Sequence, residues 1–354
     1  TYYIKNAIIG IGENMSSIYN LTYEELLNYL LDLGYKKFTA DQIFDWLYKK
    51  RVSSFDEMTN LKKELITKLK EDFTIGLLEL VKKEEDTGVK KYLFNLSDNN
   101  KIECVLMFHD YGNSLCISTE LGCNMGCAFC ESGRLKKVRN LLPSEMVSQI
   151  LTVESTESLR ITHIVLMGIG EPFDNYDNVI KFIDIINDSK GISLGSRHIT
   201  ISTCGIVPKI KEFSNYKQVN LAISLHAPNN KIRNELMPIN KAYNIEKLIS
   251  AIKEYIDKTN RRVTFEYILL RDVNDSVSCA IELANLLKGM NCYVNLIPYN
   301  ETTHIEFKKS TKSQITKFYD TLKKCGINVT IRKEFGSKVD AACGQLRSKH
   351  EEAK

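Results

Sequence analysis

Hydrophobic residues recur at helical spacing near the N-terminus of the chain. The first periodic stretch begins at Tyr23, the second runs from Thr39 through Trp46, and a third follows. The hydroxyl group of Thr39 suits the N-terminal cap of the second helix. This pattern predicts a small helical domain over residues 15–76. Residues 1–14 are interpreted as an upstream extension and are left out of the fold prediction.

After residue 76 the pattern changes to short apolar runs. Two runs within residues 77–112 flank the turn-forming sequence Ser97-Asp-Asn-Asn and predict a β-hairpin extension. Residues 113–335 then alternate strand-like with helix-like segments, and residues 336–354 form a C-terminal segment. The alternation predicts an α/β fold, a partial (β/α)6 barrel built on a parallel sheet. The predicted strands span residues 114–118, 161–167, 198–202, 219–225, 263–269 and 293–297. The predicted helices lie near residues 144–157, 175–187, 243–258, 276–288 and 311–324.

The composition is that of an ordinary globular protein. Of its 354 residues, 43% are hydrophobic and 26% are charged, with only 18 Gly and 6 Pro, which excludes disordered and low-complexity classes. No run approaches the ~18 apolar residues of a membrane-spanning helix, and no signal-peptide pattern opens the chain. We therefore expect a cytoplasmic protein without a membrane partner. The lack of coiled-coil heptads favours a monomer.

The net charge of +4 does not by itself demand a nucleic-acid partner. Basic residues of the predicted helical domain nevertheless alternate with aromatic ones. Two interpretations stay open here: a solvated surface over a helical core, or a surface that contacts RNA phosphates and bases. The residues concerned are Lys36, Lys37, Lys49, Lys50, Arg51, Lys62 and Lys63, with Tyr35, Tyr48 and Trp46.

Three of the 10 Cys follow the first predicted barrel strand at the spacing C-x-x-x-C-x-x-C: Cys123, Cys127 and Cys130. Thiolates at such spacing can converge on a soft metal centre. Three close ligands, where a closed site has four, favour a cluster with one iron open to a second molecule. A three-cysteine zinc site completed by a distant residue is the alternative. Five other cysteines fall in apolar or helical patterns and are predicted to pack in the core: Cys104, Cys204, Cys279, Cys292 and Cys325.

Polar residues follow several predicted strands at their carboxyl ends, where the loops of a barrel form the active site. The second barrel strand ends in Gly168-Ile-Gly-Glu-Pro. Here Gly170 permits a close backbone approach, and Glu171 offers a carboxylate to an ammonium group. A single histidine is more often structural, but several strand ends together with the cysteines predict one site. The other strand ends carry Ser202, Ser224, Leu225, His226 and Asn300.

With these segments, the chain resembles the radical S-adenosylmethionine (SAM) superfamily and, within it, the RlmN/Cfr family of RNA adenine methyltransferases. The resemblance covers nearly the whole chain from about residue 15. Its most specific motifs are the cysteine triad, Gly168-Ile-Gly-Glu-Pro and the C-terminal Asp340-Ala-Ala-Cys-Gly-Gln-Leu. Pro172 is typical of the RlmN branch, because Cfr sequences tend to carry Ala there.

The resemblance implies a four-iron, four-sulfur (4Fe-4S) cluster on the three cysteines and two SAM molecules per turnover. Cys343 matches the residue that becomes S-methylcysteine, and Cys116 matches the thiol that resolves the protein–RNA adduct by forming a disulfide with Cys343. Glu103 matches a proton acceptor. A buried C-terminal cysteine is the alternative for Cys343, and a surface-facing strand residue is the alternative for Glu103. The implied SAM contacts are Gly170, Glu171, Ser202, Ser224, Leu225, His226 and Asn300.

The implied reaction is methylation of carbon 2 of an adenine in 23S rRNA, and in tRNA beside the anticodon. The implied electron donor is a flavodoxin- or ferredoxin-type protein. Three alternatives stay open: a Cfr-type enzyme that methylates carbon 8 and gives antibiotic resistance, another radical SAM enzyme such as an activase, and a non-catalytic zinc-containing RNA-binding protein. The sequence departs from the family pattern at Glu131 and at Lys136, which replaces a common Gly. Lys136, Lys137 and Arg139 are candidate contacts to the RNA backbone.

Overall fold

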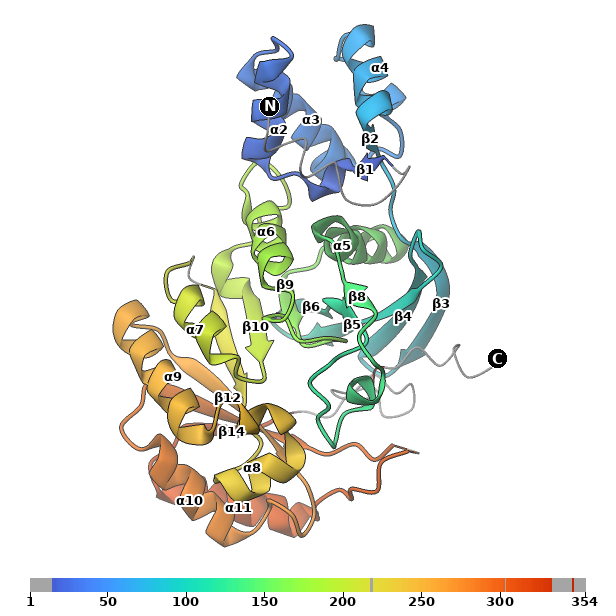
Figure 1. Cartoon of the computed structure of the whole chain (residues 1–354). Coiled ribbons are helices and arrows are strands. Elements are labelled where there is room, and N and C mark those ends of the chain that lie inside the picture. Colours follow the sequence, from blue (N-terminus) through green and yellow to red (C-terminus); the bar gives the residue numbers. More distant parts are fainter. Residues whose placement is uncertain (1–14, 217–218, 303, 333–345, 347–354) are drawn as a thin grey trace. The chain divides into compact units, whose positions relative to one another are not determined.

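The computed structural model of the chain describes residues 15–216, 219–302, 304–332 and 346 (Figure 1). The chain forms two compact units. The smaller unit comprises the described residues within 15–79, 141–159 and 177–195, and the larger comprises those within 80–140, 160–176 and 196–346. No helix among the described residues is long and apolar enough to cross a membrane.

The smaller unit is helical, as the periodicity predicts. A π-helical turn over Asp45–Lys50 continues the second of its helices, and two short strands, β1 (Ser16–Ser17) and β2 (Phe73–Thr74), pair in parallel. Later parts of the chain supply further helical segments to this unit, so it is not confined to the N-terminal residues. The helices are α2 (Tyr23–Asp32), α3 (Lys37–Phe44), α4 (Lys63–Asp72), α5 (Pro143–Glu157) and most of α6 (Tyr176–Asn187).

Capping residues set where the first helices begin. The Thr22 hydroxyl accepts from the Glu25 backbone N–H at 3.2 Å, and the Glu25 carboxylate accepts from the Thr22 N–H at 2.8 Å, which is a complete capping box for α2. The prediction that Thr39 caps the next helix is wrong. The chain turns earlier, at Gly34 with φ +81°, so α3 begins at Lys37 and Thr39 is buried inside it.

The aromatic and basic residues of the smaller unit divide between core and surface. The Tyr48 ring is buried, with its centroid 5.6 Å from that of Tyr19 and 5.0 Å from that of Phe44. Arg51 forms an ion pair with the buried Glu154. Tyr48 and Arg51 therefore serve the fold. All seven basic residues of the predicted set are exposed, including Arg51 despite its ion pair; the other six are Lys36, Lys37, Lys49, Lys50, Lys62 and Lys63.

The larger unit is built on one ten-stranded sheet in the order β14-β13-β12-β11-β10-β9-β6-β5-β4-β3. The pairs from β6 through β9 to β14 are all parallel, which confirms the predicted parallel barrel sheet. Each predicted strand is present to within about two residues at either end. The parallel strands are β6 (Gly112–Cys116), β9 (His163–Leu166), β10 (Ile199–Thr203), β11 (Asn220–Ser224), β12 (Val263–Leu269), β13 (Cys292–Pro298) and β14 (Val329–Ile331).

The predicted hairpin is formed by β4 (Val89–Asn95) and β5 (Lys101–His109), which pair in antiparallel and extend the sheet from β6. A further strand that was not predicted, β3 (Glu79–Asp86), lies beside β4 at the edge of the sheet. The register places Lys91 opposite Val105 and Val105 opposite Cys116 on β6. Residues two apart along a strand point to the same face. Glu103 therefore shares the face of Lys91 and Cys116.

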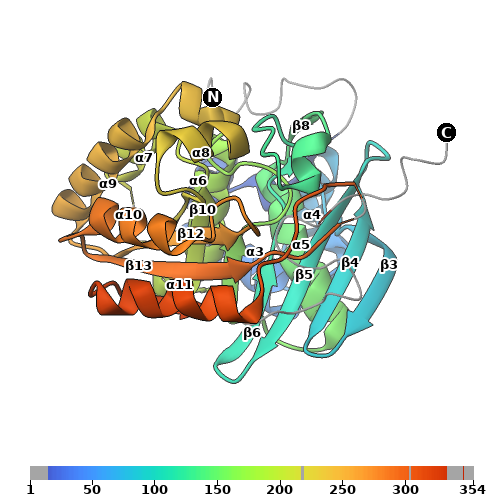
Figure 2. The same ribbon diagram turned by 90° about the horizontal axis from the view of Figure 1, so that it is seen from below.

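The helices of the larger unit lie beside the later strands (Figure 2). Two of them, α7 and α8, have seven residues each, too few for a clear helical period in the sequence. The core prediction holds for the buried Cys104, Cys204, Cys279 and Cys292 but is wrong for Cys325, which is exposed because it caps the end of α11. The helices are α7 (Val207–Phe213), α8 (Asn230–Leu236), α9 (Ile245–Thr259), α10 (Val277–Leu287) and α11 (Lys312–Lys324).

Candidate active site

The cysteine triad lies on a loop that leaves the sheet after β6 and returns through a short antiparallel ladder of β7 (Glu120–Leu121) and β8 (Arg139–Asn140). The Cys123 N–H donates to the Leu135 carbonyl at 3.0 Å, which closes the loop. Gly122 is required at its start. Its φ is +73°, and a Cβ there would lie 2.2 Å from the Lys136 carbonyl oxygen.

All three cysteines line one cavity of about 150 Å³ in the larger unit. Among the described residues, no group of three or more His, Cys, Asp or Glu side chains is close enough to hold a single metal ion. Three thiols that line one cavity suit a cluster with several irons, because each thiolate can then bind a different iron atom. The donor set therefore fits a 4Fe-4S cluster with one iron left without a cysteine ligand.

Burial strongly affects the thiols of this loop. It raises the pKa of Cys123 to about 12 and holds the pKa of Cys127 well above its ordinary value. Buried thiols of this kind stay protonated unless a cation compensates the charge of the thiolate. Iron binding would supply that compensation and release protons.

The same cavity collects the carboxyl ends of the parallel strands, as the sequence predicts. Its polar wall includes residues from the ends of β9, β10 and β11. Leu225 is buried and donates its N–H to the Glu266 carbonyl at 3.1 Å. Neither Leu225 nor Asn300 is among the described residues that line the cavity. Those predicted residues that do line it are Gly170, Glu171, Ser202, Ser224 and His226.

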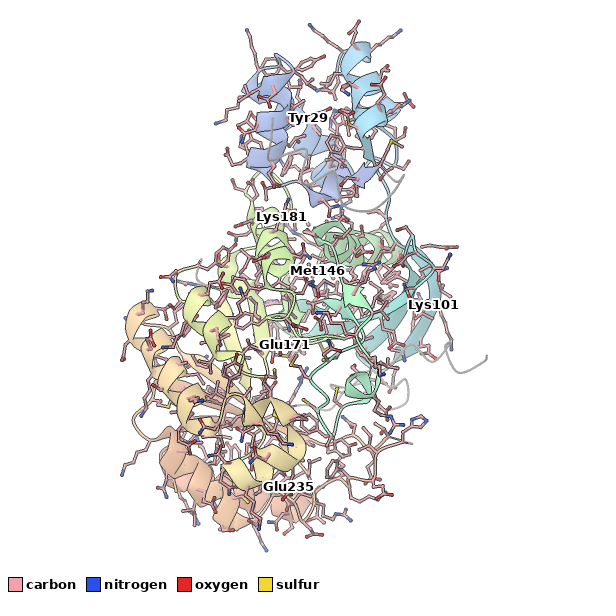
Figure 3. All side chains as sticks on the ribbon, in the orientation of Figure 1. Tyr29, Lys101, Met146, Glu171, Lys181 and Glu235 are labelled. Carbon is pink, nitrogen blue, oxygen red and sulfur yellow. The ribbon has the colours of Figure 1, made fainter. Side chains whose placement is uncertain are left out.

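Glu171 lies in the loop that follows β9, in the interior of the larger unit (Figure 3). Its carboxylate accepts the Phe173 N–H at 2.9 Å and the Cys204 N–H at 2.7 Å. Burial raises the pKa of Glu171, although these hydrogen bonds lower it in part. The carboxylate therefore joins the ends of β9 and β10 in addition to facing the cavity.

His226 is also partly structural. Its Nδ1 accepts the Ile268 N–H at 3.1 Å, and its ring meets the Phe129 ring edge-on at 4.9 Å between centroids. Burial lowers its pKa to about 3, so the ring is neutral at physiological pH. The backbone at His226 has φ +57°, a conformation that non-glycine residues adopt at a cost. Such strain is common at functional sites.

The two further predicted residues on the sheet are buried. Glu103 is 3% exposed and Cys116 is 6% exposed. Cys116 packs in one apolar cluster with Leu346, the one described residue of the C-terminal segment. The Leu346 carbonyl also accepts the Ser132 hydroxyl at 2.8 Å. Cys343 itself lies outside the described residues.

Sequence reasoning missed several polar side chains of the site. Arg233 is fully buried and donates to the Cys204 carbonyl at 2.7 Å and to the Leu225 carbonyl at 3.2 Å, which links the loops after β10 and β11. Glu266 and Arg332 line the cavity as well. An Arg in the middle of a polar helix carries no local signal of burial. For Glu266 there is one hint in the sequence. It lies between Thr264 and Ile268 at every second position of β12, so the three side chains share one face of the strand.

Two of the predicted RNA-backbone contacts are engaged within the protein. Lys137 lies with its Nζ 2.5 Å from Glu120 Oε1 and 2.8 Å from Asp174 Oδ2. Arg139 Nε lies 2.7 Å from Asp98 Oδ2. Both cations therefore fasten the cysteine loop to its surroundings. Lys136 is exposed, as an RNA contact requires.

Comparisons with known proteins agree with this geometry. Residues 117–284 match the radical SAM superfamily, and residues 16–75 match the N-terminal domain of ribosomal RNA large subunit methyltransferases. A solved radical SAM methyltransferase from Sphaerobacter thermophilus is 40% identical, with a TM-score of 0.89 over 94% of this chain and 99% of that one.

Sequence relatives match over almost the whole chain. A probable dual-specificity RNA methyltransferase RlmN of Spiroplasma citri is 57% identical over 95% of this chain and 99% of its own length. One of the same description from Acholeplasma laidlawii is 53% identical over 94% of this chain and 99% of its own length. Matches of this identity and coverage establish that the chain belongs to the RlmN family of radical SAM RNA methyltransferases.

Proposed function

We propose that this protein methylates carbon 2 of an adenine in 23S rRNA, and of an adenine beside the anticodon in tRNA. The single observation that carries the proposal is the convergence of the three cysteines with Gly170, Glu171 and the serines of β10 and β11 on one cavity. The relatives described as dual-specificity RNA methyltransferases support both RNA classes.

In this proposal Cys123, Cys127 and Cys130 hold the 4Fe-4S cluster, and two molecules of SAM are used per turnover. When bound, the cluster and SAM supply a 5′-deoxyadenosyl radical. The protein binds and orients the reactants and keeps water out, which the largely apolar lining by Phe129, Met237 and similar residues favours. The residues proposed to contact SAM are Gly170, Glu171, Ser202, Ser224, Leu225, His226 and Asn300.

Three residues act on the RNA in this proposal. Cys343 carries the methyl carbon as S-methylcysteine and delivers it to the adenine, Glu103 accepts the proton that the adenine carbon loses, and Cys116 releases the product by forming a disulfide with Cys343. The position of Leu346 against Cys116 supports this assignment. Cys343 precedes Leu346 by three residues, a length of chain that spans at most about 11 Å.

The helical domain over residues 15–76 is proposed to bind the RNA. Six exposed lysines favour this role, and the Lys50 ammonium lies 3.4 Å from the centre of the Trp46 ring. Such a combination of cations and an accessible indole suits contact with phosphates and bases. A flavodoxin- or ferredoxin-type protein is proposed as electron donor, and the enzyme is proposed to act as a monomer.

The test is anaerobic reaction of the iron-loaded protein with SAM, a reductant and a 23S rRNA fragment, followed by mass mapping of the adenine. We expect methyl at carbon 2 with the wild type and none with Cys343→Ala. Methyl at carbon 8 would assign the enzyme to the Cfr type. A colourless protein that holds one zinc and leaves RNA unmodified would refute the proposal.

A further inference from the structure

A lysine is buried next to the proposed proton acceptor. Lys91 on β4 is 4% exposed, and its Nζ lies 3.4 Å from Glu103 Oε1 and 3.2 Å from Glu84 Oε2. A buried ammonium group is costly unless it is paired. The proposed reaction gives no role to Lys91, although its side chain shares a face of the sheet with the proposed reacting groups.

The strand register explains how Lys91 reaches Glu103. Lys91 stands opposite Val105 on β5, and Glu103 is two residues before Val105 on the same face. Diagonal neighbours of this kind lie within reach of a long side chain. Val105 in turn stands opposite Cys116 on β6. The ammonium group, the carboxyl group and the thiol thus border one patch of the sheet.

The pair continues outward as a chain of alternating charges. Glu84 on β3 lies between Lys91 and Lys82, whose Nζ is 2.8 Å from Glu84 Oε1. Side-chain exposure rises along the chain from 4% at Glu103 and 5% at Lys91 to 32% at Glu84 and 54% at Lys82. Burial opposes ionisation of Glu84, but hydrogen bonds from Lys82 and Lys91 hold its pKa below the ordinary value. With both carboxyl groups ionised, the four groups together carry no net charge.

Neutrality matters for a base in a buried site. An isolated buried carboxyl group favours its neutral form, and a protonated acid cannot accept a proton. An adjacent ammonium group favours the carboxylate and fixes its orientation. During proton removal, the proton passes from the adenine carbon to the carboxylate oxygen, and the electron pair of the C–H bond remains on the ring.

We propose that Lys91 is a positioning residue, which holds Glu103 as an oriented carboxylate ready to take the adenine proton, with Glu84 anchoring the ammonium group from the solvent side. This inference rests on the proposed function. It adds a residue to the machinery that acts through Glu103 and touches neither SAM nor RNA.

The test compares Lys91→Met with Lys91→Arg and with Lys90→Met as a matched control. Lys90 is the preceding residue of β4, so its side chain leaves the other face of the strand, where its Nζ lies 3.5 Å from Glu85 Oε1. Each iron-loaded variant reacts once with SAM and an rRNA fragment. Four quantities are measured: bound iron, methyl on Cys343, covalent RNA–protein complex on a denaturing gel, and methylated adenine.

For Lys91→Met we expect iron and Cys343 methylation within about twofold of wild type, and methylated adenine formed about 100-fold more slowly, the lower end of what a general base contributes. The covalent complex that precedes proton loss should accumulate. Lys91→Arg should form methylated adenine at least tenfold faster than Lys91→Met, because a guanidinium group restores the positive charge. Lys90→Met should form it at the wild-type rate.

Two results would overturn the inference. One is product formation by Lys91→Met at the wild-type rate. The other is loss of iron, Cys343 methylation and product together in Lys91→Met without recovery by arginine, because the ion pair then only supports the fold. Failure of the wild type itself to methylate RNA would instead refute the proposed function, so the two failures are distinguishable.

Discussion

The ion pair between Glu120 and Lys137 yields a quantitative prediction about the cysteine loop. The Glu120 side chain is 0% exposed and that of Lys137 is 14% exposed. Glu120 Oε2 also accepts the Glu171 N–H at 2.8 Å, so the carboxyl group connects the returning loop with the end of β9. The change Lys137→Met removes the cation and leaves the buried carboxyl group in place.

The expected effect depends on pH. Burial raises the pKa of Glu120 from an ordinary value near 4.5 to about 7, although Lys137 lowers it in part. For an acid whose pKa is higher in the folded state, the stabilising contribution is complete below about pH 4.5 and is lost as pH rises through about 7. At pH 8 Glu120 is mostly ionised and needs its cation. At pH 6 it is mostly neutral and does not.

The magnitude follows from the cost of leaving a buried charge without its partner. At pH 8 Lys137→Met should lower the free energy of unfolding by about 3 kcal/mol. For a domain of the size of the larger unit, this loss of stability corresponds to a fall in Tm of roughly 6–12 °C. At pH 6 the loss should be less than half as large. The double variant Glu120→Gln/Lys137→Met should recover most of the loss, because glutamine still accepts the Glu171 N–H without a charge.

The assay is thermal unfolding of the full chain followed by far-UV circular dichroism, without added iron, at pH 6 and pH 8. Circular dichroism is needed because the only tryptophan, Trp46, belongs to the smaller unit. Lys136→Met is the matched control, since that neighbouring side chain is exposed. Equal losses in the two single variants, or a loss at Lys137 that does not change with pH, would refute the reasoning.

Three further substitutions test other parts of the fold. Gly170→Ala places a Cβ 2.6 Å from Glu120 Cβ and Cγ, at a residue whose φ is +107°. We expect the free energy of unfolding to fall by about 2 kcal/mol and SAM binding, measured by calorimetry, to weaken. Unchanged SAM binding would contradict this. Arg233→Met removes the groups that donate hydrogen bonds to the carbonyl of Cys204 and to neighbouring carbonyls, and it should lower the free energy of unfolding by about 3 kcal/mol. A much smaller loss would show that Arg233 does not hold these loops together. Thr22→Ala should cost about 1 kcal/mol, visible in tryptophan fluorescence during urea unfolding, while SAM cleavage stays constant.

Hydrophobic periodicity was sufficient for most of the architecture. β11 and β12 are buried over most of their length, so each appears in the sequence as a mainly apolar run, and both match their predicted ranges closely. The seven-residue α7 and α8 escaped prediction because fewer than two full turns show no period. The prediction that Thr39 caps a helix is wrong for a related reason. A hydroxyl residue caps a helix only if the helix begins there, and the start of the helix depends on where the preceding turn ends.

The candidate site was predictable only where its chemistry is local in sequence. Cys123 and Cys130 are seven residues apart, so spacing alone indicates a shared site. Arg233 and Glu266 reach the same region only through the order of the strands, and Lys91 meets Glu103 through a diagonal of the hairpin register. Register depends on pairing across the sheet, which no single segment encodes.

The lysines show most clearly why local reasoning fails for charged groups. Lysine is almost always exposed in proteins, so an isolated Lys137 is best interpreted as a surface cation free to meet phosphate. Its burial becomes reasonable only because Glu120, 17 residues earlier, and Asp174, 37 residues later, converge on the same loop. The same holds for Lys91, which lies between carboxylates from two neighbouring strands. Charges of this kind are fixed by the fold, and they then constrain it, because a buried cation can be replaced only together with its partner.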